Sequence, residues 1–152
     1  MELKTNNMEQ LHLKSVSYSE AMSEIKTIRH SVFQEEQGVD AALEFDGKDE
    51  MAVHLLAYLN SKPVGTARIR YLDRKRAKIE RLAVLSPYRG QGIGRKIMEK
   101  ALEAAAYQEI EEVVIHAQEY IKTLYFQLGF EQEGESFQEA NIPHVKMKKS
   151  LE

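Results

Sequence analysis

The sequence feature that most constrains the fold is a run of three glycines at alternate positions, Gly90, Gly92 and Gly94. The run follows a strand-like segment, residues 78–85, and precedes a helix whose apolar residues recur at three- and four-residue spacing. Backbone N–H groups in such a loop can converge on an anion at the positive end of the helix dipole. One glycine is enough for a structural turn, whereas three at alternate positions indicate close approach or unusual torsions. The pattern therefore favours phosphate binding over a purely structural turn.

The kind of phosphate ligand can be narrowed by comparing glycine spacings. A P-loop requires G-x-x-x-x-G-K-[ST], and the chain contains no Gly-Lys-Ser or Gly-Lys-Thr. The dinucleotide fingerprint is G-x-G-x-x-G on the first strand, whereas these glycines are spaced G-x-G-x-G and follow about four elements. Nucleotide hydrolysis and nicotinamide or flavin chemistry are therefore disfavoured.

The first third of the chain predicts a strand and a helix. Residues 11–16 alternate between apolar and polar side chains, as in a half-buried strand. Ser17-Tyr18-Ser19-Glu20 fits the S-x-x-E capping box, which begins a helix. The apolar residues at 22, 25, 28 and 32 would line one face of that helix, and Gly38 lies just past its expected end. Residues 35–50 are expected to form a loop.

Three adjacent antiparallel strands are predicted before the glycine run. Residues 54–59 and 64–72 are strand-like and are joined by a hairpin turn at residues 60–63. A basic turn at residues 73–76 then leads into the strand at residues 78–85.

The second half predicts a parallel crossover. Residues 113–115 are wholly apolar, which is typical of a strand covered on both faces, and a strand, a helix and such a strand suggest a right-handed crossover. A helix at residues 121–128 would stop at Gly129, and residues 130–147 hold one or two closing strands. The prediction is an α/β protein with a mixed, mostly antiparallel sheet and a single domain over residues 1–152.

Composition excludes several classes of protein. The 152 residues carry a net charge of −3 and no cysteine, so a disulfide framework, a thiol nucleophile and a cysteine-based zinc site are excluded. The histidines at positions 12, 30 and 54 show no metal-ligand spacing, and we expect no metal. The slight acidity argues against nucleic-acid binding. No apolar run is long enough to span a membrane, residues 1–7 lack the apolar core of a secretion signal, and we expect a cytoplasmic protein.

Three motifs in order resemble the GCN5-related N-acetyltransferases. Arg89, Gly92 and Gly94 match the family's signature for acyl-coenzyme A, Q/R-x-x-G-x-G/A. Leu82-Ala83-Val84 stands on the preceding strand, and residues 124–130 are similar to the family's L-Y-x-x-x-G-F. The likeness covers about residues 8–149. Residues 32–39, 116–118 and 141–145 look like the ElaA-like group of small bacterial members.

The resemblance implies a sheet splayed between its fourth and fifth strands, held open by a bulge and flanked by helices. Acetyl-coenzyme A, or another acyl-coenzyme A, would lie in the gap as co-substrate. Gln118 falls where many relatives carry an asparagine that touches pantetheine, and that departure leaves its role open. The positions that the resemblance assigns to the cofactor are Leu82, Ala83, Val84, Arg89, Gly90, Gln91, Gly92, Ile93, Gly94, Arg95, Gln118 and Tyr125.

The reaction that the resemblance implies is direct attack by a primary amine of a small molecule or a protein on the thioester. The backbone N–H of Leu82 would polarise the thioester carbonyl. Tyr125, four residues before Gly129, would protonate the departing thiolate. The alternative is that Tyr125 only packs beside Phe126 and Phe130.

The general base is less well defined by the sequence. With a period of two, Glu80 shares a strand face with Leu82 and Val84 and could act through water, or it could instead form an ion pair with Arg81 or Arg68. His116, at the end of the strand across the gap, is a second candidate, set against a strand-end histidine. His144 is expected to be structural.

Charge also offers a clue to the amine substrate. Residues 35–50 contain seven carboxylates and one lysine, Lys48. Such a segment could attract a cationic amine, or it could be a solvated loop. The basic turn of Arg74, Lys75 and Arg76 could steer a polyanion, or it could be an ordinary hairpin tip.

Two other functions compete with the acyltransferase. A non-catalytic sensor or interaction module could keep the acyl-coenzyme A cleft without turnover. Acyl-homoserine-lactone synthesis is a third hypothesis, because Arg29 and Phe33 loosely resemble that related group, although the chain is short for it. Dimers are common in the family, so a homodimer is compatible with the resemblance.

Overall fold

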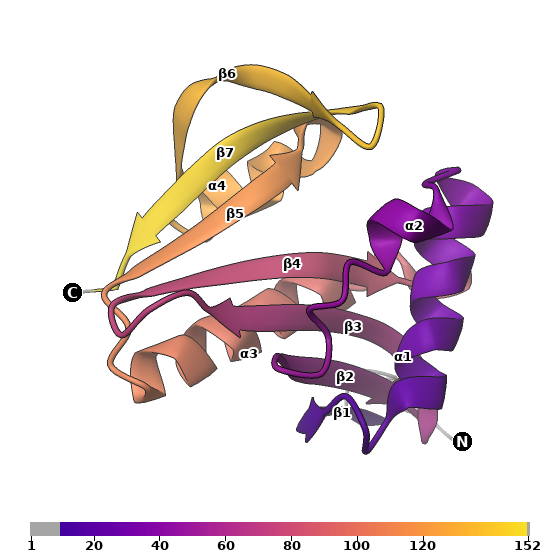
Figure 1. The fold of residues 1–152 in the computed structure, drawn as a ribbon. Coiled ribbons are helices and arrows are strands. Elements are labelled where there is room, and N and C mark those ends of the chain that lie inside the picture. Colours follow the sequence, from indigo (N-terminus) through magenta and orange to yellow (C-terminus); the bar gives the residue numbers. More distant parts are fainter. Residues whose placement is uncertain (1–9, 152) are drawn as a thin grey trace, which may run out of the picture.

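The computed structural model describes residues 10–151, so the segment 1–7 considered for a secretion signal lies outside the described residues. Within residues 10–151, seven strands form a sheet in the order β1-β2-β3-β4-β5-β7-β6 (Figure 1). All neighbours are antiparallel except β4 and β5, which confirms the predicted crossover and the mixed sheet. The strands are β1 (Leu11–Ser17), β2 (Val53–Leu59), β3 (Lys62–Tyr71), β4 (Arg76–Val84), β5 (Glu112–Gln118), β6 (Glu131–Glu139) and β7 (Ile142–Ser150).

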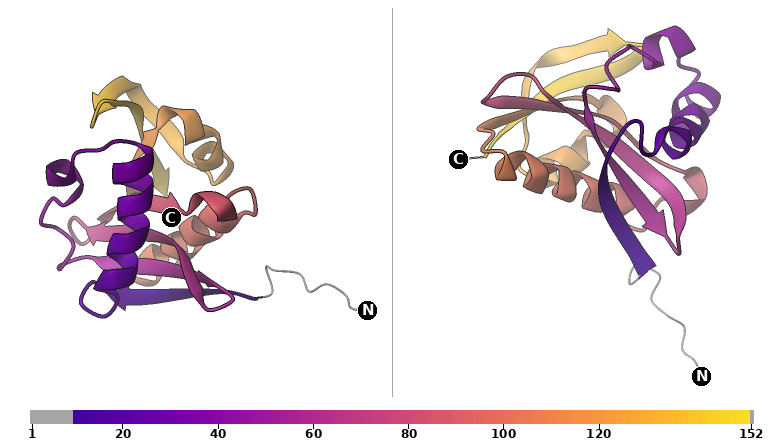
Figure 2. Two further views of the ribbon diagram at one scale, coloured as in Figure 1. Left: turned by 90° about the vertical axis from the view of Figure 1, so that its right-hand side faces the viewer. Right: turned by 60° about the horizontal axis from the view of Figure 1, so that its bottom comes forward.

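Helices cover both faces of the sheet (Figures 1 and 2). On one face α1 packs Ile25 and Ile28 against Leu56 of β2, and on the other face α3 packs Ile97 and Met98 against Leu55. No helix within residues 10–151 combines the length and the apolar character needed to cross a bilayer. The helical elements are α1 (Met22–Arg29), the π-helix η2 (His30–Glu36), α2 (Ala41–Glu44), the 3₁₀ turn η3 (Ser86–Tyr88), α3 (Ile93–Tyr107), the 3₁₀ turn η4 (Glu119–Ile121) and α4 (Lys122–Gln127).

Local signals set most element boundaries, with three corrections. The capping-box bonds form between Ser17 and Glu20, but α1 begins only at Met22 with Ala21 as its N-cap. The predicted loop 35–50 contains the helix α2, whose N-cap, Asp40, accepts a hydrogen bond from the backbone N–H of Ala42. The hairpin predicted at 60–63 turns on residues 60 and 61 alone, both with positive φ, and the next two residues already belong to β3.

The sheet splays between β4 and β5, as expected. These strands pair only over residues 76–78 of β4 and 112–114 of β5, and they separate beyond that point. A bulge on β4 accompanies the separation: Glu80 pairs with Arg68 and Ala83 with Thr66, so two residues of β4 oppose Ala67. Arg81, inside the bulge, has a φ of +60°, a conformation that disfavours side chains with a Cβ.

The bulge overturns one prediction about the site. Because it adds a residue to β4, the two-residue period breaks between Glu80 and Val84. Glu80 and Ala83 lie on the face covered by α1, whereas Val84 pairs with Gly65 and faces α3. Leu82 packs against the same α3-side cluster as Val84, so Glu80 shares a strand face with neither of them.

Candidate functional site

A cleft of about 730 Å³ opens where β4 and β5 separate. Its walls come from β4, the glycine loop, the end of η2, the end of β5, α4 and the turn between β6 and β7. Among the predicted site residues only Gln91 is missing from the lining. The cleft thus brings together Glu80, Leu82, Ala83, Val84, Arg89, Gly90, Gly92, Ile93, Gly94, Arg95, Gln118 and Tyr125.

The glycine loop closes one end of this cleft. Gly90 and Gly92 have φ values of +79° and +80°, so their backbone conformation, and not lack of space, requires glycine. Gly92 is also the N-cap of α3. A Cβ on Gly94 would meet only the Val84 side chain, at 3.8 Å, so the protein alone does not demand glycine there. The backbone N–H groups of Gly94 and Arg95 find no acceptor within the described part of the chain.

Arg89 ties the glycine loop to its neighbours. Its two terminal nitrogens each donate to a carboxylate oxygen of Glu36 at 2.6 Å, and its Nε donates to the carbonyl of Val84 at 2.8 Å. The side chain therefore links the loop to the end of η2 and to the last residue of β4. A bound anion would reach this guanidinium in competition with Glu36.

Gln118 contacts the same end of η2 from the opposite wall. Its amide nitrogen donates to Gln37 Oε1 at 2.9 Å, and the Gln37 amide nitrogen lies 3.4 Å from Gln118 Oε1. Through Glu36 and Gln37, the end of η2 therefore bonds to both sides of the cleft. Sequence reasoning missed Gln37, because nothing local pairs it with a residue 81 positions away.

Tyr125 sits on α4 in the wall of the cleft. It is 7% exposed, and its ring packs edge-on against Phe130 at 5.9 Å between ring centroids. Burial, together with Tyr120, raises the pKa of the phenol above its usual range, so the hydroxyl stays protonated at neutral pH. The packing role with Phe130 is therefore present in the structure, and Phe126, which is 46% exposed, takes no part in it.

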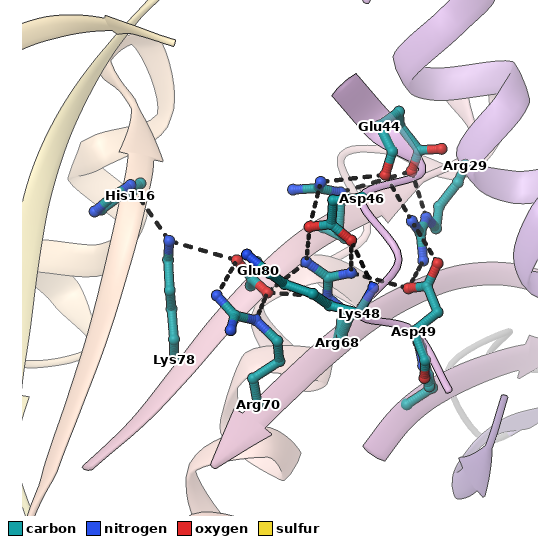
Figure 3. Close-up of polar contacts among 12 residues, drawn as sticks. Arg29, Glu44, Asp46, Lys48, Asp49, Arg68, Arg70, Lys78, Glu80 and His116 are labelled. Carbon is teal, nitrogen blue, oxygen red and sulfur yellow. Dashed lines mark hydrogen bonds and ion pairs between the residues drawn. The ribbon is translucent and has the colours of Figure 1, made fainter. Parts of the chain in front are cut away.

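Glu80 lies in a group of charged side chains on the α1 face of the sheet (Figure 3). It accepts hydrogen bonds from Arg68 and Arg70, and Lys78 Nζ lies 3.5 Å away. Burial raises the pKa of Glu80, but hydrogen bonds from Arg70 and the charges of Arg68 and Lys78 outweigh it and lower the pKa to about 2. These contacts favour the ion-pair interpretation, because such a carboxylate is a weak proton acceptor at neutral pH.

The acidic segment 35–50 is solvated only in part. Three of its carboxylates turn inward onto arginines that come from α1, β3 and β4 (Figure 3). Arg29 and Arg68 are each no more than 1% exposed. The pairs are Glu44 with Arg29 and Arg81, Asp46 with Arg68 and Arg81, and Asp49 with Arg29 and Arg68.

This arrangement, which we call the charge network, consists of these six residues with Glu80, Arg70 and Lys78. Arg81 takes part in it without contacting Glu80, so of the two partners proposed for Glu80 only Arg68 is confirmed. Arg29, considered above for lactone synthesis, is used here to hold α1 against the loop.

His116 faces the cleft from the end of β5. Its Nδ1 lies 2.9 Å from Glu139 Oε1 and 3.5 Å from Lys78 Nζ, and its ring packs edge-on against Phe137. The carboxylate thus fixes the ring orientation. His144 is 6% exposed and donates from Nδ1 to the carbonyl of Ile142, as a structural histidine would.

The sequence and the fold of this chain are both similar to those of known proteins. The sequence model described as the Acetyltransferase (GNAT) domain matches residues 12–151. The Bacillus subtilis protein YyaT is 35% identical over 144 residues, which cover 93% of this chain and 97% of YyaT. The crystal structure of Escherichia coli ElaA is similar with a TM-score of 0.81 and 26% identity, over 91% of this chain and 99% of ElaA.

A more distant structure contains the co-substrate that the resemblance implies. It is a GNAT family acetyltransferase from Elizabethkingia anophelis with acetyl-CoA bound, and its TM-score is 0.73 over 94% of this chain and 99% of its own. At 16% identity it shows a likeness in fold alone. Together with the splayed sheet and the glycine loop, the match to the domain and to YyaT confirms the expected family, and ElaA is among the relatives. The chain is a member of the GNAT family of acetyltransferases.

Proposed function

We propose that this chain is an N-acyltransferase that moves an acetyl group from acetyl-coenzyme A to a primary amine. The observation that carries the proposal is the cleft between β4 and β5, which ends on a glycine loop whose last N–H groups have no acceptor within residues 10–151. The acetyl-CoA-bound fold neighbour supports the choice of co-substrate.

Binding would use backbone groups at two places. The pyrophosphate would rest on residues 89–94 at the positive end of α3. The pantetheine arm would lie along residues 82–84, where β4 has no β5 partner. A buried backbone group without a partner costs roughly 1–3 kcal/mol, so amides of the arm would satisfy groups that the splay leaves open.

The chemistry needs one hydrogen-bond donor and one acid. When bound, acetyl-coenzyme A supplies the thioester whose C–S bond breaks as the amine nitrogen forms its bond to the carbonyl carbon. The Leu82 N–H would stabilise charge on the carbonyl oxygen, and a donor of this kind is worth about 2.7–4 kcal/mol. Tyr125, which burial keeps protonated, would give its proton to the leaving sulfur.

For the proton that the amine must lose, His116 has better support than Glu80. If Nδ1 donates to Glu139, Nε2 carries the lone pair and can accept a proton. Glu80 stays a hypothesis as the base, but its bonds to two arginines favour a structural role. A His116→Gln variant should lose turnover while keeping cofactor affinity.

Amine-dependent release of coenzyme A thiol tests the function as a whole. The purified protein with acetyl-coenzyme A should release thiol only when an amine is added. Tight binding of acetyl-coenzyme A without thiol release across a broad amine panel would instead indicate a sensor or interaction module.

A further inference from the structure

The end of the cleft beyond Leu82 carries an excess of positive charge. In the charge network, five cationic side chains face four carboxylates. Glu44, Asp46 and Asp49 each pair with one or both of the buried residues Arg29 and Arg68. The excess positive charge therefore lies at the other end of the network, around Glu80. Glu80 is the one carboxylate of the network that pairs with Arg70 and Lys78, and it also pairs with Arg68.

The cations at this end are accessible from the cleft. Arg70 and Lys78 both line it, and their side chains are 23% and 18% exposed, whereas Arg68 is fully buried. Lys78 Nζ lies 3.5 Å from both Glu80 and His116, distances that leave its ammonium open to a closer partner. Lys48, which also lines the cleft, has no ion pair within residues 10–151.

Each of the four carboxylates that line the cleft already has a charged or hydrogen-bonded partner. Glu139 lines this end and is bonded to His116, while Asp46 is held by Arg68 and Arg81. A polyamine would therefore place its second charge beside Arg70 and Lys78, where like charges repel. An anionic group would meet a partly desolvated guanidinium and an ammonium, the pairing that gives strong charge-assisted hydrogen bonds.

We infer that the amine substrate carries an anionic group, a carboxylate or a phosphate, that binds Arg70 and Lys78 while its amine lies near His116. Figure 3 shows Lys78 between Glu80 and His116, so the anion site and the proposed base are neighbours. The inference rests on the proposed function and names the class of its substrate. It replaces the cationic substrate suggested by the acidic segment, because the carboxylates of that segment that line the cleft, Glu44 and Asp46, are already paired with arginines.

Matched amines test this inference through kcat/KM. Glycine, β-alanine, 4-aminobutyrate and 6-aminohexanoate would each be compared with the corresponding primary amide, together with 2-aminoethylphosphonate and spermidine. The kcat/KM of at least one acid should exceed that of its amide tenfold or more. The phosphonate distinguishes a phosphate site from a carboxylate site. Preference for the amides or for spermidine would overturn the inference.

Substitutions test whether Arg70 is responsible for the preference for the acid over its amide. Arg70→Gln should lower the acid-to-amide ratio at least tenfold, mainly through KM, and Arg70→Lys should restore part of it. Arg74→Gln removes an equal charge from the exposed turn outside the cleft and should leave the ratio unchanged. If Arg70→Gln fails to fold, Lys48→Gln on the exposed loop should lower the ratio severalfold. An unchanged ratio in a folded Arg70→Gln would overturn the inference.

A binding measurement separates this inference from the proposed function. The best acid of the series and its amide would be titrated into coenzyme A-loaded protein while NMR follows the Arg70 Nε–H and Lys78 Nζ resonances. Shifts caused by the acid alone, without thiol release from any amine, would refute the acyltransferase and support the anion site. Thiol release that is equal for acid and amide, without shifts of these resonances, would support the acyltransferase and refute the anion site.

Discussion

The substitution Glu80→Gln separates a structural role from a catalytic one. Gln keeps the shape of the side chain but removes the charge that faces Arg68, Arg70 and Lys78. The pKa of Glu80 is lowered from 4.5 to about 2, and the side chain is only 10% exposed. That difference corresponds to about 3 kcal/mol of folding free energy at neutral pH. We therefore expect Glu80→Gln to be less stable by about this amount at pH 7.

The pH dependence gives the sign of the effect. Because folding lowers the pKa of Glu80, its contribution is complete well above pH 4.5 and is lost as the pH falls toward 2. About 2 kcal/mol of it should be gone by pH 3. The stabilities of the parent and of Glu80→Gln should therefore converge between pH 5 and pH 3, as measured by urea denaturation at each pH.

A surface carboxylate provides the matched control. Glu99 pairs with Arg95 at 3.3 Å, but its side chain is 47% exposed, so Glu99→Gln should change stability by less than about 1 kcal/mol. A parent-like stability of Glu80→Gln at pH 7, combined with turnover that is lost and partly restored at high pH, would refute the ion-pair account. That result would return Glu80 to the role of general base.

Three further substitutions, one of them with a matched control, test Tyr125, the glycine loop and the charge network. Tyr125→Phe should lower turnover roughly 10²-fold while calorimetry shows unchanged acetyl-coenzyme A affinity; parent-like turnover would leave Tyr125 with packing alone. Gly92→Asp should weaken acetyl-coenzyme A binding at least about tenfold by calorimetry. Gly134 has a φ of +82° and equally open space, so Gly134→Asp is the matched control and should leave acetyl-coenzyme A binding unchanged. Equal affinities of the two variants for acetyl-coenzyme A would contradict the phosphate site. Arg29→Met removes one of the two arginines that pair with each of Glu44 and Asp49 and should lower the free energy of unfolding by about 3–5 kcal/mol in urea denaturation; a change below about 1 kcal/mol would contradict the charge network.

The parts of the fold that could be predicted are those with local signals. Alternation along β1, the apolar residues 113–115 and the glycines around α3 each fix a period or a backbone conformation within a few residues. The crossover followed from the order of these elements, whereas the splay of the sheet was expected only from the family resemblance. The positive φ of Gly90 and Gly92 is likewise a local property that the sequence displays.

The parts that could not be predicted depend on distant residues. The resemblance implied a bulge but did not locate it. The bulge lies at Arg81 and reverses which face Val84 occupies, and the only local sign of it is that Glu80-Arg81 interrupts the alternation of β4. The charge network joins Arg29 to Glu44 across 15 positions and Arg81 to Asp46 across 35. No periodicity indicates such pairs, so the sequence did not show that three of the seven carboxylates of the acidic segment are paired with arginines inside the protein.

Titration of acetyl-coenzyme A into ¹⁵N-labelled protein shows whether the cleft between β4 and β5 binds the thioester. We expect the amide resonances of residues 82–84 and 89–94, the two stretches that line the cleft on either side of η3, to shift together and to saturate at one stoichiometric equivalent. The resonances of β1, at the far edge of the sheet, should stay in place. Saturable binding that shifts neither stretch would contradict the assignment of this cleft to the thioester substrate.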